Sequence, residues 1–486
     1  MSLRLRALFI LTACLLGCDA KVRLASYYGD HMVLQKSPAR AVLWGYGPEG
    51  AHVTVSLSGP IQLRTSPVTV TKGIWRVTLD PVEPGGPYML MVSSESNTIT
   101  LKDVLFGDIW VCGGQSNMQF QTSRVFNASS ELALAPKYPH VRPFQAALNV
   151  SETELPDLVQ VQIPWSVPTA GVMSEFSAVC WLFGRYLYDV LKYPIGLVES
   201  CWGGTPVEAW SSSRALQQCK LDRMIGGPRN DSILWNSMIH PLLNMTIYGA
   251  IWYQGEANTG YHPNKYNCSF PAMIDDWRMA FHQGSCGQTD PDFPFGFVQL
   301  STYTKNSTSE KYPNLRWHQT ADTGFVPNSR MKKTFMAVAL DLPDESSPYG
   351  TIHPRDKQDV AYRLTLGARA VAYNQTGVPF LGPFPKEILR LPNSIVVHYD
   401  QAISVTSSKD IYEICCSKTA CGLNSLWVPA PILSWDSASV RISTASCKGS
   451  SVAGLRYAWK DWPCDFKACP VYSANKVLPA PPFISN

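Results

Sequence analysis

The sequence is poor in charge, and it has no long apolar run after its N-terminus. Only 16% of its residues are Asp, Glu, Lys or Arg, against roughly 25% in an average globular chain. The formal charge of +4 is spread over 486 residues without a Lys/Arg block, which excludes strong attraction for nucleic acid or anionic lipid. No later segment approaches the roughly 18 to 20 apolar residues that a membrane helix needs. We expect no nucleic-acid partner and no membrane insertion.

The first 20 residues have the pattern of a secretory signal peptide. In "MSLRLRALFILTACLLGCDA", Arg4 and Arg6 precede an apolar stretch, and small residues follow with Ala20 as the cleavage point. The string "LLGC" also resembles a bacterial lipobox, so a lipoprotein is the alternative. We expect the mature chain to start near Lys21.

Cysteines and glycosylation acceptors agree with a secretory route. Of 14 cysteines, Cys14 and Cys18 fall in the predicted signal peptide, and the remaining twelve can form several disulfides in an oxidising compartment. Six of them lie close together near the C-terminus, in 15 conceivable pairings, and lack the paired C-x-x-C units of a zinc site. The Asn-X-Ser/Thr acceptors are Asn127, Asn149, Asn230, Asn244, Asn267, Asn306 and Asn374.

The texture of the sequence changes twice and predicts three domains. Short period-two segments such as "HVTVSLSG" and "GIWRVTLD" fill residues 21–106 and indicate a small β-sandwich. Residues 107–378 alternate strand candidates with helix-period stretches such as "AVCWLFGRYLYDVLK" and "DKQDVAYRLTLGARAVAYN", which favours a parallel sheet between two helical layers. Strands return in residues 379–486 as a cysteine-rich β domain. No internal repeat or low-complexity segment is found.

Four strand candidates of the central region end in unusual polar loops. These are "GGQSNM", "ESCWGGTPVEAW", "WYQGEAN" and "DLPDESSPYGTIHPRDK". Because function in open parallel sheets collects at the carboxyl ends of strands, we expect the four loops to converge on one crevice.

Ser116, in the first of these loops, has the position of a nucleophile. A serine at the tip of a strand is held out of the sheet close to backbone N–H groups that can receive an oxyanion. Gly113 and Gly114 permit the tight turn. A serine needs a base, and His353 is the histidine at the strand–loop–helix junction that ends the α/β region. A helix cap for Ser116 and a structural hydrogen bond for His353 are the alternatives.

The motifs together resemble one enzyme family. No G-x-S-x-G elbow is present. Instead, "VCGGQSNMQF", "ESCWGGTPVEAW", "LWNSMIHPL", "IWYQGEAN" and "SPYGTIHPRDKQDVAYRLTLGARA" follow the order of the SGNH-type hydrolases and strongly resemble the sialate O-acetylesterases. The resemblance covers nearly the whole mature chain. It implies an SGNH-hydrolase-like, three-layer α/β domain flanked by N-terminal and C-terminal β-rich domains.

The resemblance also implies roles for single residues. Ser116 would be the nucleophile and His353 the general base. The oxyanion hole would combine the backbone amides of Ser116 and Gly203 with the side-chain amide of Gln254. Gly204 and Asn258 are the respective rivals, and a plain turn or a loop brace is the alternative for each.

The acid that orients the histidine in many SGNH enzymes is missing from its usual place. Three residues before His353 the chain has Gly350. Asp341, Asp344 and Asp356 are candidates from elsewhere, and a Ser–His dyad with a backbone carbonyl in place of the acid is the remaining option.

Substrate contacts are harder to predict. Arg355 offers a planar fork for the carboxylate of a sialic acid, although a solvent-facing charge is an equal alternative. Trp202, Trp252 and Tyr253 are expected either beside the sugar or in the core. Glu256 is expected to act as a brace. No metal site is expected, because no second carboxylate or histidine shares its spacing.

We therefore predict a serine esterase that removes O-acetyl groups, chiefly 9-O-acetyl, from free sialic acids or sialoglycans through an acetyl-enzyme. It should need no cofactor and should be lysosomal or secreted. An O-acetylesterase for another carbohydrate and an inactive glycan-binding protein on the same fold are the alternatives.

Overall fold

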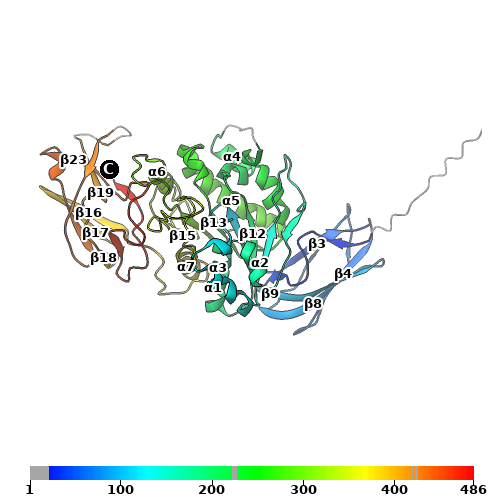
Figure 1. The fold of residues 1–486 in the computed structure, drawn as a ribbon. Coiled ribbons are helices and arrows are strands. Elements are labelled where there is room, and N and C mark those ends of the chain that lie inside the picture. Colours follow the sequence, from blue (N-terminus) through cyan, green and yellow to red (C-terminus); the bar gives the residue numbers. More distant parts are fainter. Residues whose placement is uncertain (1–20, 222–226, 418–419, 422–424, 486) are drawn as a thin grey trace, which may run out of the picture.

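The computed structural model describes residues 21–221, 227–417, 420–421 and 425–485, so the predicted signal peptide lies outside the described residues. Figure 1 shows an elongated molecule in which the N-terminal strands, a central body of sheet and helices, and the C-terminal strands follow one another. Within the described part, no helix is both long and apolar enough to cross a bilayer.

Short strands with period-two burial build the N-terminal part. In β4 (His52–Ser58), for example, Val53, Val55 and Leu57 are buried while the residues between them are partly exposed, which is the pattern of a strand with one face on a core. Two groups of strands pair here. They are β1 (Arg23–Leu24), β3 (Val42–Tyr46) and β7 (Ile74–Thr78), and β4 with β5 (Leu63–Arg64), β6 (Val68–Thr69) and β8 (Gly85–Ser93).

One long strand, β9 (Thr98–Gly114), joins the N-terminal part to the central sheet. Its first half pairs with β8, and residues 105–107 pair with β2 (Val33–Gln35). Its second half is the middle strand of the central sheet. The domain boundary predicted after residue 106 falls inside this strand, and one continuous apolar core covers both sides of it. The division into three domains therefore stays a prediction.

The central sheet has the order β11-β10-β12-β9-β13-β14-β15. Its strands are parallel except for β11 at the edge. Every residue of β12 to β15 is buried, which explains their continuous apolar sequence. The strands are β10 (Val141–Ala146), β11 (Val161–Ile163), β12 (Ile195–Cys201), β13 (Gly249–Tyr253), β14 (Phe295–Gln299) and β15 (Thr334–Val338).

Helices cover both faces of this sheet, so the predicted three-layer α/β fold is confirmed (Figure 1). On one face Trp277 of α5 (Tyr266–Gly284) meets Trp252 of β13 edge to face, with ring centroids 5.7 Å apart. On the other, Phe183 of α3 (Ala178–Leu191) lies 5.0 Å from Trp110 of β9. The remaining α-helices are α1 (Ala128–Leu134), α2 (Ala170–Glu175), α4 (Ser213–Gln218), α6 (Lys311–His318) and α7 (Gln358–Gly367).

The C-terminal part is built from strands around an apolar cluster of its own, formed by residues between Ile395 and Phe483. Three small sheets enclose it. They contain β16 (Pro385–Leu391), β17 (Ser394–Tyr399), β21 (Ile432–Trp435) and β22 (Ser439–Ser443); β18 (Ile403–Val405) and β24 (Val471–Ser473); and β19 (Tyr412–Cys416), β20 (Trp427–Pro429), β23 (Val452–Tyr457) and β25 (Phe483–Ser485).

Five disulfides confirm the expectation of several bridges. They use all six cysteines near the C-terminus, which leaves none of these for zinc. Cys201, which is buried, and Cys286, which is exposed, have free thiols. The pairs are Cys112–Cys180, Cys219–Cys268, Cys415–Cys421, Cys416–Cys447 and Cys464–Cys469.

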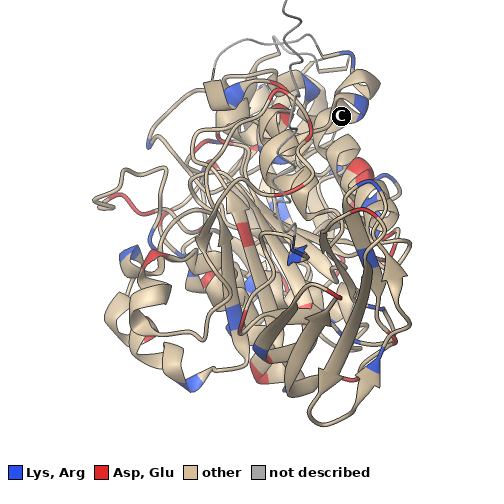
Figure 2. Ribbon diagram, turned by 90° about the vertical axis from the view of Figure 1, so that its right-hand side faces the viewer, with Lys and Arg blue, Asp and Glu red and all other residues tan. Residues whose placement is uncertain are grey.

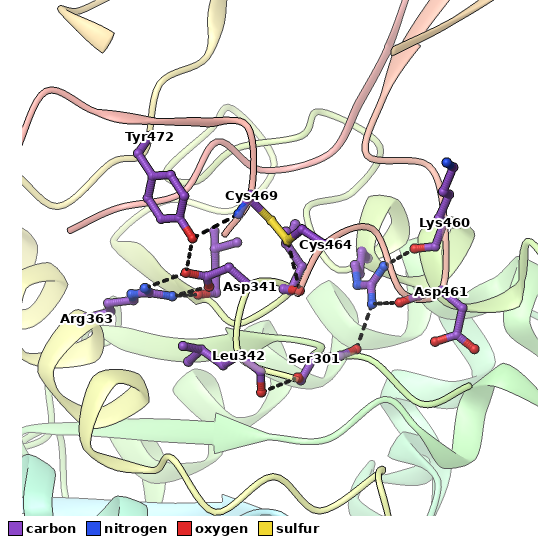
Figure 3. Close-up of a disulfide and its surroundings, with 12 residues drawn as sticks. Ser301, Asp341, Leu342, Arg363, Lys460, Asp461, Cys464, Cys469 and Tyr472 are labelled. Carbon is purple, nitrogen blue, oxygen red and sulfur yellow. Dashed lines mark hydrogen bonds and ion pairs between the residues drawn. A yellow bond between two sulfur atoms is a disulfide. The ribbon is translucent and has the colours of Figure 1, made fainter. Parts of the chain in front are cut away.

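Buried charges fasten the C-terminal part to the central body beside the Cys464–Cys469 bridge (Figure 3). The Asp341 carboxylate accepts two hydrogen bonds from Arg363, at 2.6 and 2.9 Å, and one of 2.8 Å from the hydroxyl of Tyr472. The rest of the charge is thinly distributed, and Figure 2 shows basic and acidic residues scattered over helices, strands and loops.

Candidate active site

The four polar loops meet at the carboxyl edge of the central sheet, as predicted. Because β9 lies between β12 and β13, the loops that follow these strands are neighbours. The amide of Trp202 donates to the carbonyl of Gly114 at 3.0 Å, and the amide of Gln115 donates to Tyr253 at 3.0 Å. The fourth loop joins them through Asn117, whose side chain donates to the carbonyl of Ile352 at 2.9 Å.

Ser116 follows β9 in a turn that only glycine permits at one position. Gly114 has a φ of 140°, and a Cβ there would lie 2.2 Å from the carbonyl oxygen of Tyr253. The turn is closed by the amides of Met118 and Gln119, which both donate to the carbonyl of Gln115 at 2.9 Å. Ser116 therefore stands outside the sheet while its neighbours are tied down.

Ser116 and His353 form a hydrogen-bonded pair. Nε2 of His353 lies 2.9 Å from Oγ of Ser116, and Nδ1 of His353 lies 2.8 Å from the carbonyl oxygen of Tyr349. A carbonyl only accepts, so Nδ1 carries the proton and Nε2 is left to accept the proton of Ser116. This is the arrangement of a nucleophile with its general base.

The surroundings keep the imidazole of His353 neutral. Burial lowers its pKa, and the positive charges of Lys357 and Arg124 act in the same direction, against the hydrogen bond to Tyr349, which raises it. The net pKa lies below the ordinary histidine value. A neutral imidazole is the form that can take a proton from serine.

None of the three predicted acids bonds to His353 in the described structure. Asp341 is engaged with Arg363 and Tyr472, as described above. Asp344 accepts two hydrogen bonds from the side chain of Arg355 and one from its amide. Asp356 accepts from the amide of Asp359 and lies 3.7 Å from Lys467. In the described structure Nδ1 of His353 therefore bonds to the carbonyl of Tyr349, which is the geometry of the dyad option left open by the sequence.

The pair opens onto a cavity of about 430 Å³. This volume is within the range of small-molecule sites. Phe120 packs parallel to the imidazole of His353, with ring centroids 6.4 Å apart, and Tyr349 meets Phe120 edge to face at 5.3 Å. Five further residues line the cavity with the pair, and sequence reasoning named none of them. They are Gln119, Phe120, Gln121, Arg124 and Tyr349.

Known proteins resemble this chain in sequence and in fold. Residues 106–348 match a family model described as carbohydrate esterase, sialic acid-specific acetylesterase, and residues 388–486 match the sialate O-acetylesterase C-terminal domain. The sialate O-acetylesterase of Homo sapiens is 49% identical, with 95% of this chain and 92% of that protein covered. That of Mus musculus is 48% identical, with 96% and 94% covered.

The chain belongs to the sialate O-acetylesterase family. It is accordingly an enzyme, a carboxylic ester hydrolase. A crystal structure of a carbohydrate acetylesterase from Xanthomonas citri has a TM-score of 0.81 and 28% sequence identity, and the match covers 96% of this chain and 99% of that one. The family assignment thus agrees with the order of motifs in the sequence.

Gly203 lies beside Ser116, in the second loop. A Cβ at this position would be 3.3 Å from the Cβ of Ser116, so the loop after β12 passes very close to the serine. The amide of Gly203 donates to Oε1 of Gln119 at 2.9 Å. Gly204, the rival donor, has a φ of 74° and completes the turn. The oxyanion role of Gly203 stays a prediction, with proximity to Ser116 in its favour and the bond of its amide to Gln119 against it.

Gln254 and Asn258 brace the second and third loops against each other. Nε2 of Gln254 donates to the carbonyl of Thr205 at 3.2 Å and to Oδ1 of Asn258 at 2.7 Å, so both of its hydrogens have acceptors. Asn258 also accepts from the amide of Val207 and donates to Glu208, at 2.9 Å each. Both side chains are fully buried. An oxyanion role for Gln254, or for Asn258, stays a prediction that these bonds do not favour.

Arginine is present at the cavity, at a position that sequence reasoning passed over. The predicted carboxylate receptor, Arg355, has its guanidinium on Asp344 at 2.6 and 2.9 Å. Arg124 is exposed and lies over the ring of Tyr349, 5.3 Å from its centroid. Among the residues that the structure describes, Arg124 has no acidic partner. Its place eight residues after Ser116 was the available sequence signal.

A buried polar network holds the loop of Ser116 against the loop of His353. Asn117 donates to Glu256 at 2.6 Å and to Ile352 at 2.9 Å, and it accepts from Nζ of Lys357 at 2.7 Å. Burial lowers the pKa of Lys357 to about 7 and raises that of Glu256, against the attraction between the two charges. Glu256 thus has the bracing contact that the sequence suggested.

The three aromatic residues named from the sequence differ in how far their side chains are exposed. Trp252 and Tyr253 are fully buried and belong to the core, whereas Trp202 is partly exposed. None of the seven predicted acceptor asparagines is buried, and Asn127, the nearest in sequence to Ser116, is exposed. Glycosylation at these sites stays a prediction.

Proposed function

We propose that this chain removes O-acetyl groups, chiefly 9-O-acetyl groups, from free sialic acids and sialoglycans. The observation that carries the proposal is the 2.9 Å hydrogen bond between Ser116 and His353 at the mouth of an open cavity. Membership of the sialate O-acetylesterase family supports the substrate class.

The reaction is a two-step acyl transfer through an acetyl-enzyme. Nε2 of His353 takes the proton of Ser116 as Oγ attacks the acetyl carbon. The oxyanion accepts hydrogen bonds from the amide of Ser116 and from that of Gly203, which exchanges Oε1 of Gln119 for the oxyanion. Each such donor is worth on the order of 10² to 10³ in rate. The intermediate collapses, the sugar oxygen leaves with the proton from His353, and Ser116 keeps the acetyl group. His353 then takes a proton from water, whose oxygen attacks the ester. The second intermediate collapses, the bond between the acetyl carbon and Oγ breaks, and His353 returns the proton to Oγ of Ser116 as acetic acid leaves. No cofactor takes part.

Recognition of a sialate requires a cation for its carboxylate. We assign this role to Arg124, because its guanidinium borders the cavity and has no acidic partner within the described residues, whereas Arg355 is held by Asp344. Arginine can pair with a carboxylate through two parallel hydrogen bonds. The proposed site thus binds the charged end of the sugar while Ser116 receives the acetyl end.

The first test is acetate release from 9-O-acetylated sialic acid by the purified glycoprotein. We expect Ser116→Ala to lose activity by more than about 10⁴-fold, as serine hydrolases do without their nucleophile. Ser130→Ala, an exposed serine of α1 that leaves the Asn127 acceptor intact, is the matched control. A fluorophosphonate probe should label the wild type at Ser116, and an unlabelled, correctly disulfide-bonded protein would instead be an inactive glycan binder.

The second test separates sialates from neutral acetylated sugars. The kcat/KM values for 9-O-acetylated sialic acid and for acetylated xylose are compared in the wild type and in Arg124→Gln. We expect the ratio of the two values to fall about tenfold or more in the variant, chiefly through KM, with partial recovery in Arg124→Lys. An unchanged ratio would remove Arg124 from the proposal.

We also infer passage through the secretory pathway to a lysosomal or extracellular destination. The five disulfides support an oxidising compartment. Expression in animal cells, followed by enzymatic removal of N-glycans and gel analysis, tests this inference. A protein whose mobility does not change would contradict it.

A further inference from the structure

A second cleft, of about 530 Å³, adjoins the catalytic cavity. The two share Gln119 and Gln121 in their walls, so they are neighbours. The second cleft continues along the edge of the central sheet, over Gln145 of β10 and Gln162 of β11. We call it the amide cleft, after these four glutamines. Nothing in the two-step reaction uses it.

Three of the glutamines are held by one end and offer the other. Oε1 of Gln119 accepts from the amide of Gly203, Nε2 of Gln121 donates to Glu175 at 2.6 Å, and Nε2 of Gln145 donates to Glu199 at 3.1 Å. Within the described part of the chain, their opposite amide atoms have no partner, and neither has the side chain of Gln162. The cleft therefore presents oriented donors and acceptors together, the combination that hydroxyl groups satisfy because they do both.

Apart from Glu175, the remainder of the wall is apolar. Leu148 is 46% exposed, and Ile163 and Val172 are partly exposed beside the amides. Glu175 is the single charged residue among those that line the cleft, and it is hydrogen-bonded to Gln121. Such a surface suits a ring that has hydroxyl groups at its edge and C–H groups on its face. It offers no cation for a second carboxylate or a phosphate.

We propose that the amide cleft binds the neutral sugar to which the sialic acid is linked, so that the enzyme prefers acetylated sialoglycosides to the free acetylated acid. This inference rests on the proposed function. In a sialoside, carbon 2 bears both the carboxylate and the glycosidic bond. Gln121 lines both cavities, three residues before Arg124. A carboxylate at Arg124 therefore directs the next sugar into the amide cleft.

The test compares two substrates with the same ester. These are free 9-O-acetylated sialic acid and the same acid linked to lactose, with acetate release followed for both. In the wild type we expect kcat/KM for the glycoside to exceed that for the free acid by about 3- to 10-fold per hydrogen bond formed in the cleft. Gln162→Ala should lower this preference by about 3- to 10-fold.

Two further variants complete the design. A Cβ at Gly171 of α2 would have Thr169 Oγ1 at 3.9 Å as its nearest neighbour, so Gly171→Trp adds a side chain at an open position in the wall of the cleft. We expect Gly171→Trp to abolish the preference for the glycoside. Gln217 is an exposed glutamine on α4 outside both cavities, and Gln217→Ala should leave kcat/KM for both substrates unchanged.

The outcomes distinguish this inference from the proposed function. If both substrates are hydrolysed but their kcat/KM ratio is near one in the wild type, or is the same in all variants, the amide cleft is not a sugar site while the esterase assignment stands. If neither substrate is hydrolysed by a labelled, folded enzyme, the proposed function fails and the inference fails with it. A preference that Gln162→Ala weakens and Gly171→Trp removes supports both.

Discussion

Replacing Lys357 by methionine tests how the buried network controls the catalytic base. Lys357 is fully buried, and its ammonium group contacts Oδ1 of Asn117 at 2.7 Å and faces the rings of Phe120 and Tyr253 at 4.9 and 5.2 Å. Methionine has a similar volume and no charge, so Lys357→Met removes the cation with little change in packing.

The structure predicts the direction of the effect on catalysis. The positive charge of Lys357 lowers the pKa of His353, so its removal raises that pKa. The kcat/KM of the wild type should therefore fall on the acid side only at a pH below about 6.5, the ordinary pKa of histidine. In Lys357→Met this acid limb should move to higher pH, because the base becomes protonated earlier as the pH falls.

The same substitution changes how stability depends on pH. A fall of the lysine pKa from 10.5 to about 7 corresponds to about 5 kcal/mol against the charged native form, since each pKa unit is about 1.4 kcal/mol. Below pH 7 both folded and unfolded chains hold this proton, and the whole penalty is present. Between pH 7 and about 10.4 only the unfolded chain holds it, so the wild type gains about 1.4 kcal/mol per pH unit relative to the variant.

Two assays measure these effects. The pH dependence of kcat/KM on 9-O-acetylated sialic acid gives the acid limb, and urea-unfolding midpoints at pH 7, 8 and 9 give the relative stability. Lys332→Met, an exposed lysine, is the control. An acid limb that does not move, together with a stability difference that stays constant from pH 7 to 9, would refute the reasoning.

The other predictions concern the carbonyl, the oxyanion and a disulfide. Asp344→Asn should lower kcat by less than about tenfold, because the carbonyl of Tyr349 holds His353, whereas loss of a true triad acid costs about 10⁴-fold; a loss of that size would make Asp344 the acid. Gly203→Ala should lower kcat by about 10² or more with KM nearly unchanged, because its methyl group would stand 3.3 Å from Cβ of Ser116; a change in KM alone would argue for a binding role. Replacing both Cys112 and Cys180 by serine should destabilise the fold by about 2 to 5 kcal/mol in denaturant unfolding, and an unchanged midpoint would contradict this.

Much of the fold could be predicted from the sequence because its signals are local. The apolar run that ends at Gly114 became the last part of β9, and the amphipathic segment after Ser177 became α3. The hydroxyl of Ser177 accepts from the amide of Cys180 and so begins that helix. The strands β10, β11 and β14 were not anticipated.

The pairing of Ser116 with His353 could be predicted because topology brings their loops together. Both follow strands of one parallel sheet, and such loops share an edge whatever separates them along the chain. The orienting group could not be predicted in the same way. A backbone carbonyl has no residue type, so the role of Tyr349 depends on how the loop from residue 344 to 353 turns back on itself.

Arg355 and Gln254 show a second limit, the choice of partner. Arg355 was predicted to bind a carboxylate and Gln254 to donate to an oxyanion. In the structure Asp344 holds Arg355, and the carbonyl of Thr205 and the side chain of Asn258 hold Gln254. The position of a residue in the sequence predicts that it lies near the site. Whether its hydrogen-bond donors already have partners depends on residues from other parts of the chain. Arg124 and the glutamines of the amide cleft differ in having unused groups, which only the structure reveals.

A carbonyl in place of a carboxylate changes the balance of the catalytic base. The carbonyl of Tyr349 fixes the tautomer of His353, but it brings no full negative charge to stabilise the imidazolium formed when Ser116 attacks. Lys357 and Arg124 add positive potential and disfavour the imidazolium further. Such a base is weaker, and it stays neutral to a lower pH. The site therefore gives up part of its driving force for proton transfer in return for activity under acidic conditions, which is the regime that the proposed lysosomal destination would impose.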